Sequence, residues 1–461
     1  MLAGDIVRTF RLEKRVACTI PLAMQGKCQC QFSNLECSDL RTIVPQSNPT
    51  RIFRLVVRDS NLVLNANSFT NWNLTDVRLE NCNLTDSSFN PNIFNSLVDE
   101  LRTLSLPNNK ITKLPAALSK LTRLMNLDVS NNPIDDQHFD ENILRDIGDT
   151  LLNLTFGGNA LHKWPTTLKH LQKLQELILT SGDISIMPPG AFHGFVGTLY
   201  RLTIAHTNLR SVPLAIAGLR YLQELHFDHN TNVGDYGVRI PIISGLLPYL
   251  YQMSLKDDNI TEFPGILKSF LHLNVLNMDE NDLKFVSDKS ASAATHISDL
   301  SLQNSGITRV PGAIQDITDL NVLDLSHNSI HAIETNDLKE STELFTLKLS
   351  NNPILYISDD AFASQTKLRR LEMRNVLLKK VPCAIEAMLR NHRLGHVFID
   401  LSGNKIECNC GLRWLYQIIN DGIHASFNLV GNCDTINSSI QQYVNTQLSS
   451  CPAGVDCSDS I

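Results

Sequence analysis

The residues best suited to chemistry are histidines and carboxylates that recur at regular intervals in the middle of the chain. His206, His229, Asp257 and Glu280 follow one another at spacings of 23, 28 and 23 residues. Imidazole and carboxylate groups that are brought together can bind a divalent metal, or change charge near neutral pH. They can also form an ordinary polar surface that contacts a protein. The sequence favours this last interpretation and assigns no metal and no cofactor, with a pH-sensitive contact as the first alternative.

The motifs of common enzyme classes are absent. The chain contains no G-x-S-x-G, G-x-x-x-x-G-K-[ST], H-E-x-x-H or G-x-G-x-x-G segment. Its formal net charge of −7 argues against nucleic acid as the main partner. We therefore expect a protein that is not an enzyme and does not bind nucleic acid.

The spacing of the histidines and carboxylates comes from an internal repeat. The segment L-x-x-L-x-L-x-x-N-x-L, seen at Leu101–Ile111 and Leu320–Ile330, can be aligned with the chain fifteen times in steps of 22 to 28 residues. Its asparagine slot holds Ser60, Cys82, Asn109, Asn132, Asn159, Gly182, Thr207, Asn230, Asp258, Asn281, Ser305, Asn328, Asn352, Val376 and Asn404. Such a period is typical of leucine-rich-repeat solenoids. The resemblance predicts an α/β fold, a curved horseshoe of about fifteen repeats with a parallel β-sheet on its concave face.

The repeat also predicts which side chains are displayed. Strand side chains alternate, so the two leucines of L-x-L point inward and the residues beside them form columns on the concave surface. Solenoids offer such surfaces for binding. We expect a protein ligand or receptor there, and a sulfated glycan is a second candidate partner for the basic residues. The polar zone comprises His206, His226, Asp228, His229, Asp257, Asp279 and Glu280, and the basic zone comprises Lys348, Arg370 and Arg374.

Cysteines flank the repeats at both ends. Cys18, Cys28, Cys30 and Cys37 precede the first repeat, and Cys408, Cys410, Cys433 and Cys451 follow the last. Each set of four allows three pairings, and two zinc sites are an alternative that the lack of a C-x-x-C pair disfavours. The arrangement resembles the disulfide-bonded caps of extracellular leucine-rich-repeat proteins. That resemblance implies the pairs Cys18–Cys30, Cys28–Cys37, Cys408–Cys433 and Cys410–Cys451.

Three further cysteines and five sequons extend this interpretation. Cys82 occupies an asparagine slot, so we expect a small buried thiol. Cys383 lies on the convex side, and Cys457 lies in the tail, where it could pair with another chain. The implied disulfides indicate an oxidising compartment. Five N-x-S/T sequons, which are glycosylated in secreted proteins, agree with such a compartment. We expect glycans at Asn73, Asn83, Asn153, Asn259 and Asn437.

The ends of the sequence carry no recognisable targeting segment. Residues 1–16 lack the apolar stretch of a signal peptide, and no run of about 18 apolar residues that could span a membrane occurs. We expect that a signal peptide is missing and that the protein is secreted or displayed at the cell surface. The predicted parts are a disordered segment 1–17, a cysteine-rich cap 18–48, a solenoid 49–406, a second cap 407–452 and a tail 453–461.

The resemblance is broad rather than specific to one protein. The chain resembles the class that includes Slit-like and Toll-like ectodomains, which implies recognition of a protein ligand in adhesion, signalling or innate recognition. The alternative is a secreted non-catalytic subunit that stabilises an enzyme complex, similar to the leucine-rich-repeat partner of decapod shrimp luciferase. Co-elution of the purified protein with a small enzyme would distinguish the two functions.

Overall fold

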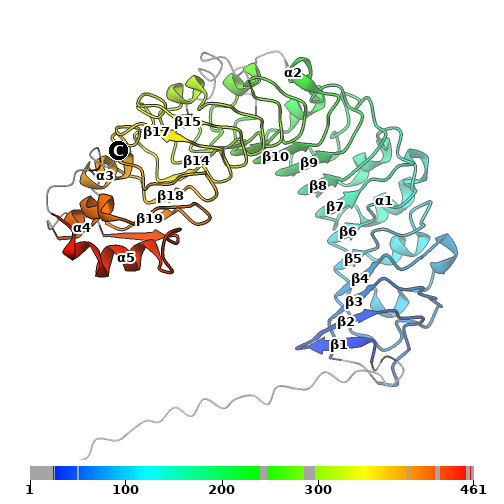
Figure 1. The fold of residues 1–461 in the computed structure, drawn as a ribbon. Coiled ribbons are helices and arrows are strands. Elements are labelled where there is room, and N and C mark those ends of the chain that lie inside the picture. The colour runs from blue at the N-terminus through cyan, green and yellow to red at the C-terminus, as the bar shows by residue number, and fades with distance from the viewer. Residues whose placement is uncertain are drawn as a thin grey trace, which may run out of the picture. The chain divides into compact units, whose positions relative to one another are not determined.

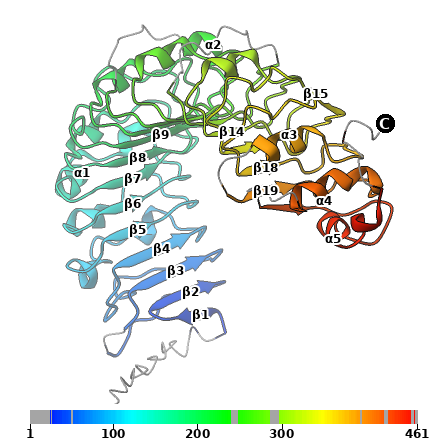
Figure 2. The same cartoon turned by 90° about the vertical axis from the view of Figure 1, so that its left-hand side faces the viewer.

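The computed structural model describes residues 24, 26–48, 51–238, 247–284, 296–391, 395–420, 426–452 and 457. The chain divides into two compact units, Met1–Ile184 with Ala191–Thr198, and Ser185–Gly190 with Leu199–Ile461. In each unit the main strands line one face, which we call the strand face, and most short helices lie on the opposite face (Figure 1 and Figure 2). Among the described helices, none is both long and apolar enough to cross a bilayer.

The first unit begins with an antiparallel hairpin and continues as a parallel ladder. Strand β1 pairs with β2, and β2 starts the parallel series that runs through β8. The strands are β1 (Cys28–Gln31), β2 (Asn34–Ser38), β3 (Arg54–Arg58), β4 (Asp76–Glu80), β5 (Thr103–Ser105), β6 (Asn126–Asp128), β7 (Asn153–Phe156) and β8 (Glu176–Leu179).

The second unit is a parallel ladder from its first strand to its last. In pairing order the strands are β9 (Arg201–Ala205), β10 (Glu224–Asp228), β11 (Gln252–Ser254), β12 (Val275–Asn277), β13 (Asp299–Ser301), β14 (Val322–Asp324), β16 (Thr346–Lys348), β18 (Arg370–Glu372), β19 (Val397–Asp400) and β20 (Phe427–Val430). A separate parallel pair is formed by β15 (Ala332–Ile333) and β17 (Tyr356–Ile357).

Prolines start a recurrent helical turn. Five 3-10 helices, η4 (Ala116–Lys120), η6 (Thr166–His170), η7 (Leu214–Gly218), η8 (Gly265–Ser269) and η10 (Gly312–Asp316), each follow a proline whose φ lies between −60° and −70°. The ring fixes this φ, so each proline sets the chain direction at the start of the turn. The other helices that the structure describes are η2 (Asp86–Ser88), η3 (Asn95–Leu97), η5 (Asp136–His138), η11 (Cys410–Leu412), η12 (Leu448–Ser450), α1 (Glu141–Ile147), α2 (Gly234–Gly237), α3 (Ala384–Asn391), α4 (Arg413–Asn420) and α5 (Ile440–Thr446).

The core consists of one leucine-rich position stacked from strand to strand. Leu104, Leu127 and Leu154 are successive partners in the first unit, and Leu300, Leu323 and Leu347 are successive partners in the second. Each of these side chains is at most 2% exposed. The predicted leucine-rich-repeat solenoid is therefore confirmed, and its stability derives from burial of apolar side chains between neighbouring repeats.

Buried asparagine amides bind consecutive repeats to one another. In the predicted slot, the side-chain oxygen accepts N–H groups of the preceding repeat. The side-chain nitrogen donates to carbonyls of the preceding repeat and of its own repeat. This pattern, which we call the amide ladder, occurs at Asn109, Asn132, Asn230, Asn281, Asn328, Asn352 and Asn404.

The prediction that Asn159 belongs to the amide ladder is wrong. Asn159 is exposed. Gly157 has a φ of +129°, and Gly158 lies so close to Asn132 that an added Cβ would be 2.2 Å from its carbonyl oxygen. These two glycines give the backbone a path that residues with side chains rarely take. The chain therefore turns before Asn159 and leaves its amide in solvent.

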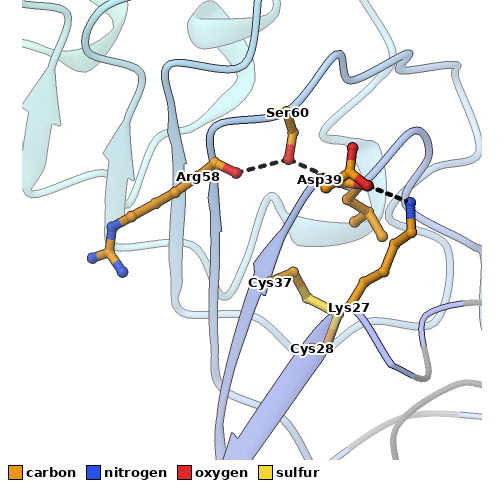
Figure 3. The surroundings of a disulfide bond; sticks show 7 residues. Lys27, Cys28, Cys37, Asp39, Arg58 and Ser60 are labelled. Atoms are coloured by element: carbon orange, nitrogen blue, oxygen red, sulfur yellow. Dashed lines mark hydrogen bonds and ion pairs between the residues drawn. A yellow bond between two sulfur atoms is a disulfide. The ribbon is translucent and has the colours of Figure 1, made fainter.

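The first repeat shows how a shorter side chain serves the same slot. The Ser60 hydroxyl accepts the Leu40 N–H at 2.9 Å and donates to the Arg58 carbonyl at 2.8 Å. The predicted Cys28–Cys37 disulfide lies beside it and joins the strands of the hairpin (Figure 3). Cys30 is also disulfide-bonded, and its predicted partner Cys18 lies outside the described residues.

The C-terminal disulfides confirm two predictions and correct a third. Cys408–Cys433 and Cys410–Cys451 form as expected. Cys457, which the sequence suggested could pair with another chain, is bonded to Cys383 of the same chain. The correction has a simple cause, since the fold brings together two cysteines that are 74 residues apart in sequence.

Cys82 is the free cysteine among the described residues, and it is buried as predicted. Its thiol donates to the carbonyls of Val57 and Glu80, both at 3.3 Å. Burial raises the pKa of Cys82 to about 12. Because the thiolate is the reactive form, we expect this thiol to resist alkylation until the chain unfolds.

Candidate interaction surface

The strand face of the second unit displays two columns of side chains. One column runs from Arg201 through Glu224 to Gln252, and a second runs from Thr203 through His226 to Ser254. Of the predicted ligand-binding residues, His226 and Asp228 lie on β10, Lys348 on β16 and Arg370 on β18. Asp279 and Arg374 follow β12 and β18 by two residues.

The four histidine and carboxylate residues that are best suited to chemistry do not lie on strands. His206, His229, Asp257 and Glu280 follow the ends of β9, β10, β11 and β12, and their φ angles are +52°, +58°, +53° and +59°. The backbone must turn here so that the next residue enters the amide ladder. In this turn the residue adopts the left-handed region of the backbone φ and ψ angles. The predicted column therefore exists, but it lies along the edge where the strands end.

This edge is a continuous row, which we call the turn row. Its members in the second unit are His206, His229, Asp257, Glu280, Asn304, His327, Asn351, Asn375 and Gly403, all with positive φ. For every member of the row whose backbone N–H bond is described, the N–H donates to a carbonyl of the next repeat. The N–H of His229, for example, donates to the carbonyl oxygen of Lys256 at 2.7 Å. The row is thus held at the regular spacing of the ladder.

Side chains of the turn row contact one another. The rings of His206 and His229 are stacked, with centroids 4.5 Å apart and planes 1° from parallel. His229 Nδ1 lies 2.9 Å from Asp257 Oδ2. Glu280 forms an ion pair with Lys256 at 3.0 Å. One nitrogen of His229 and one oxygen each of Asp257 and Glu280 lie within 4.8 Å of one another.

Every cation of the predicted basic zone has a carboxylate partner. Lys348 pairs with Asp324 at 3.0 Å, and Arg374 pairs with Asp400 at 2.6 Å. Arg370 pairs with Glu372 within its own strand. Burial alone would raise the pKa of Asp400, but hydrogen bonds from Ser402 and Arg374 hold it below its usual value. Because these charges are neutralised in pairs, the geometry gives the sulfated-glycan hypothesis no support.

Sequence reasoning missed a group of exposed tyrosines at the opposite end of the strands. Tyr221, Tyr249 and Tyr251 are 54%, 58% and 52% exposed. The rings of Tyr221 and Tyr249 stack with centroids 6.1 Å apart, and Asn274 Nδ2 donates to the Tyr251 hydroxyl at 2.9 Å. We call these three residues the aromatic edge. The sequence does contain one sign of this group, because Tyr221 and Tyr249 both directly precede the first leucine of their repeat.

The predicted glycosylation sites differ in their surroundings. Asn73, Asn83, Asn259 and Asn437 are exposed. Asn153 is half-buried on β7, where its amide donates to Asn126 Oδ1 at 2.6 Å. A glycan at Asn153 would therefore displace a contact within the strand face of the first unit, whereas the other four sites have room for one.

Asp258 is an acid in a slot built for an amide. Its Oδ1 accepts the Asn230 N–H at 2.8 Å, but its buried Oδ2 has no hydrogen-bond partner. Burial, together with the nearby carboxylates of Asp228 and Asp257, raises the pKa of Asp258 to about 8. At the equivalent position, Asn281 donates its amide to two buried carbonyls, which a carboxylate cannot do.

We expect Asp258→Asn to stabilise the second unit by roughly 1–3 kcal/mol, because the amide restores hydrogen bonds that a buried carboxylate lacks. The measurement is thermal unfolding at pH 9 with EDTA present, because Asp258, with its pKa raised to about 8, is mostly ionised at that pH. Asn328→Asp is the matched control, since it places an acid in a normal rung and should lower the midpoint temperature. A lower midpoint for Asp258→Asn would show that this rung does not follow the ladder pattern.

Comparison with known proteins agrees with this architecture. A family model described as leucine rich repeat matches residues 295–354, and a model described as leucine rich repeats (2 copies) matches residues 99–141. No curated protein sequence matches the chain.

Solved structures with this fold come from several organisms. A leucine-rich-repeat protein of Leptospira interrogans is 21% identical, with 85% of this chain and 93% of that chain covered and a TM-score of 0.50. A chain of the Drosophila Toll–Spätzle complex is 16% identical, with 85% and 60% covered and a TM-score of 0.48. A chain of the octameric complex of Latrophilin 3, Unc5D and FLRT2 is 22% identical, with 71% and 91% covered and a TM-score of 0.47. The repeats and the amide ladder show a leucine-rich-repeat fold with disulfide-bonded ends, and the two family models match parts of it.

Proposed function

We propose that this chain is an extracellular protein-recognition scaffold, secreted or part of a receptor ectodomain, and that it binds a protein ligand through the strand face and aromatic edge of its second unit. The observation that carries the proposal is the aromatic edge itself. Tyrosine combines a large apolar ring with a hydroxyl that can hydrogen-bond, and it is enriched among residues that dominate binding energy at protein interfaces.

The surroundings of the aromatic edge favour binding with little reorganisation. The backbone of β10 and β11 is fixed by pairing on both sides, and the rungs at Asn230 and Asn281 hold the turns that follow these strands. Side chains on such a rigid frame lose little conformational freedom on binding, which lowers the entropic cost of association. Arg201 and Glu224, paired at 2.7 Å, add a polar rim on the neighbouring strands.

The hollows of the described surface favour a macromolecular partner over a buried small molecule. An apolar cavity lined by Val212, Leu225, Met253 and Ile266 has a volume of about 20 Å³, which is room for about one water molecule. A larger hollow in the first unit, lined by Asp59, Asn81, Asn108 and Lys110, is polar and open to solvent. Ligand pockets for small molecules are usually concave and mostly apolar.

The disulfides support the extracellular part of the proposal. Four bonds are described, at both ends of the repeats, and such bonds persist in oxidising compartments. The exposed sequons at Asn259 and Asn437 are compatible with the same compartment. Asn259 lies beside the turn row, so a glycan there would leave the aromatic edge as the accessible side of the second unit.

The test is a binding screen of the secreted chain against a panel of extracellular proteins, followed by substitution. We expect Tyr249→Ala and Tyr251→Ala each to weaken the partner found by about tenfold or more, as truncation of a central interface tyrosine does. Tyr356→Ala is the matched control, because Tyr356 is also 54% exposed but lies on β17, outside the strand face. Unchanged affinity in both edge variants, or an equal loss in Tyr356→Ala, would refute the proposed site.

A further inference from the structure

We infer that His229, Asp257 and Glu280 form a binding site for a divalent cation of the zinc class. Each donor comes from the same position in three successive repeats, and the three turns share one left-handed conformation. Equal backbone geometry at a regular spacing makes the side chains project in parallel from the edge. The donor atoms of all three already lie within 4.8 Å of one another.

The distances fit a metal with little movement. Zinc binds imidazole nitrogen and carboxylate oxygen at roughly 2.0–2.2 Å, so neighbouring donors in its coordination sphere stand about 3 Å apart. His229 Nδ1 and Asp257 Oδ2 have this spacing already, at 2.9 Å. Glu280 must move its carboxylate closer by rotation of its side chain, which is 39% exposed and is held by the ion pair with Lys256. Water would complete the coordination, as it does at open zinc sites.

Glu280 is not a residue type that the turn itself favours. Elsewhere in the second unit the row contains His206, Asn304, His327, Asn351, Asn375 and Gly403, and asparagine, aspartate, histidine and glycine occupy the left-handed region more readily than glutamate does. The carboxylates of Asp257 and Glu280 lie on adjacent turns and repel each other. Asparagine at position 280 would serve the turn better, and a bound cation would offset the repulsion between the two carboxylates.

The neighbours of the cluster define what an ion must displace and what holds the ligands. Lys256 Nζ lies 3.0 Å from Glu280 Oε1 and occupies the position of a cation there. His206 stacks on the face of His229 and fixes the plane of its ring. A divalent ion would replace the proton between His229 and Asp257 and compete with Lys256 for Glu280. Removal of the Lys256 charge should therefore tighten binding, which no purely structural role of this residue would do.

The donor set also selects the class of ion. One imidazole and two carboxylates suit zinc, cobalt or nickel. Calcium takes six to eight oxygen ligands, and magnesium keeps most of its water and binds through oxygen alone. We therefore expect zinc and cobalt to bind in preference to calcium and magnesium.

The experiment uses the secreted full chain, stripped with EDTA and dialysed. Zn²⁺ is titrated by calorimetry, and Co²⁺ is titrated by its visible absorption, with Ca²⁺ as the comparison ion. We expect a single equivalent of Zn²⁺ that His229→Gln and Asp257→Asn each weaken by at least about tenfold. Lys256→Gln should bind more tightly than the unchanged chain. His327→Gln is the matched control, since it removes an imidazole from the same row where the neighbour is Asn351 rather than a carboxylate.

Three results would overturn the inference. The first is the absence of saturable Zn²⁺ or Co²⁺ binding by the unchanged chain. The second is unchanged affinity in His229→Gln and Asp257→Asn, with thermal unfolding showing that both variants are folded. The third is an equal loss in His327→Gln, which would indicate non-specific binding to histidines. None of these measurements involves a protein partner, so the proposed recognition function stands or fails separately.

Discussion

Asn328→Ala is expected to destabilise the second unit by at least about 3 kcal/mol, because several buried groups lose their hydrogen-bond partners at once. The Asn328 side-chain oxygen accepts the N–H groups of Ser305 at 2.9 Å and Ile307 at 3.1 Å. Its nitrogen donates to the carbonyls of Leu302, Leu325 and Ser326 at 2.8, 3.0 and 3.2 Å. All five bonds are buried, so water cannot replace the amide.

The chain contains a matched control for this substitution. Asn159 occupies the same slot by alignment but is exposed, so Asn159→Ala should leave the unfolding of the first unit unchanged. The measurement is urea unfolding of both variants, combined with hydrogen exchange at the Ser305 and Ile307 amides. Those two amides should lose protection in Asn328→Ala. Equal unfolding curves for the two variants would mean that the amide ladder contributes little to stability.

The contrast between Asn328 and Asn159 shows how far the sequence determines this fold. The leucine period is a strong predictor because it repeats, and a misaligned copy would place apolar side chains in solvent. A single slot is less certain, because local backbone freedom can override it. At Asn159 two preceding glycines allow a different turn, and the period alone carries no information about that choice.

The candidate surface was harder to predict for a related reason. Alternation along a strand identifies outward positions only while the strand lasts, and β11 and β12 end three residues before Asp257 and Glu280. Pairing across repeats also decides which charges are free. Asp324 and Asp400, which neutralise Lys348 and Arg374, lie 24 and 26 residues away in sequence. The aromatic edge was visible as a repeated position, but it carries no motif that marks it as functional.

Loss of the Cys408–Cys433 disulfide is expected to open the C-terminal end of the second unit. The bond fastens the segment that begins just before α4, where Trp414, Leu415 and Ile418 are at most 1% exposed. These side chains, with Leu429 of β20, belong to a small end domain that depends on its cross-links. We expect the double variant Cys408→Ala with Cys433→Ala to lose about 2–5 kcal/mol of stability, the usual cost of removing a native disulfide from such a domain.

The third C-terminal disulfide distinguishes two explanations of that loss. If constraint of the unfolded chain were the main effect, removal of Cys383–Cys457 would cost more, because it closes 74 residues and Cys408–Cys433 closes 25. If sealing of the core is the main effect, Cys408–Cys433 matters more, because it anchors the segment leading into α4. We expect the second order, measured by thermal unfolding of the two double variants and by hydrogen exchange in β19 and β20. Greater loss on removal of Cys383–Cys457 would assign stability at this end to chain constraint, and the segment around Cys457 would then belong to the cap rather than to a tail.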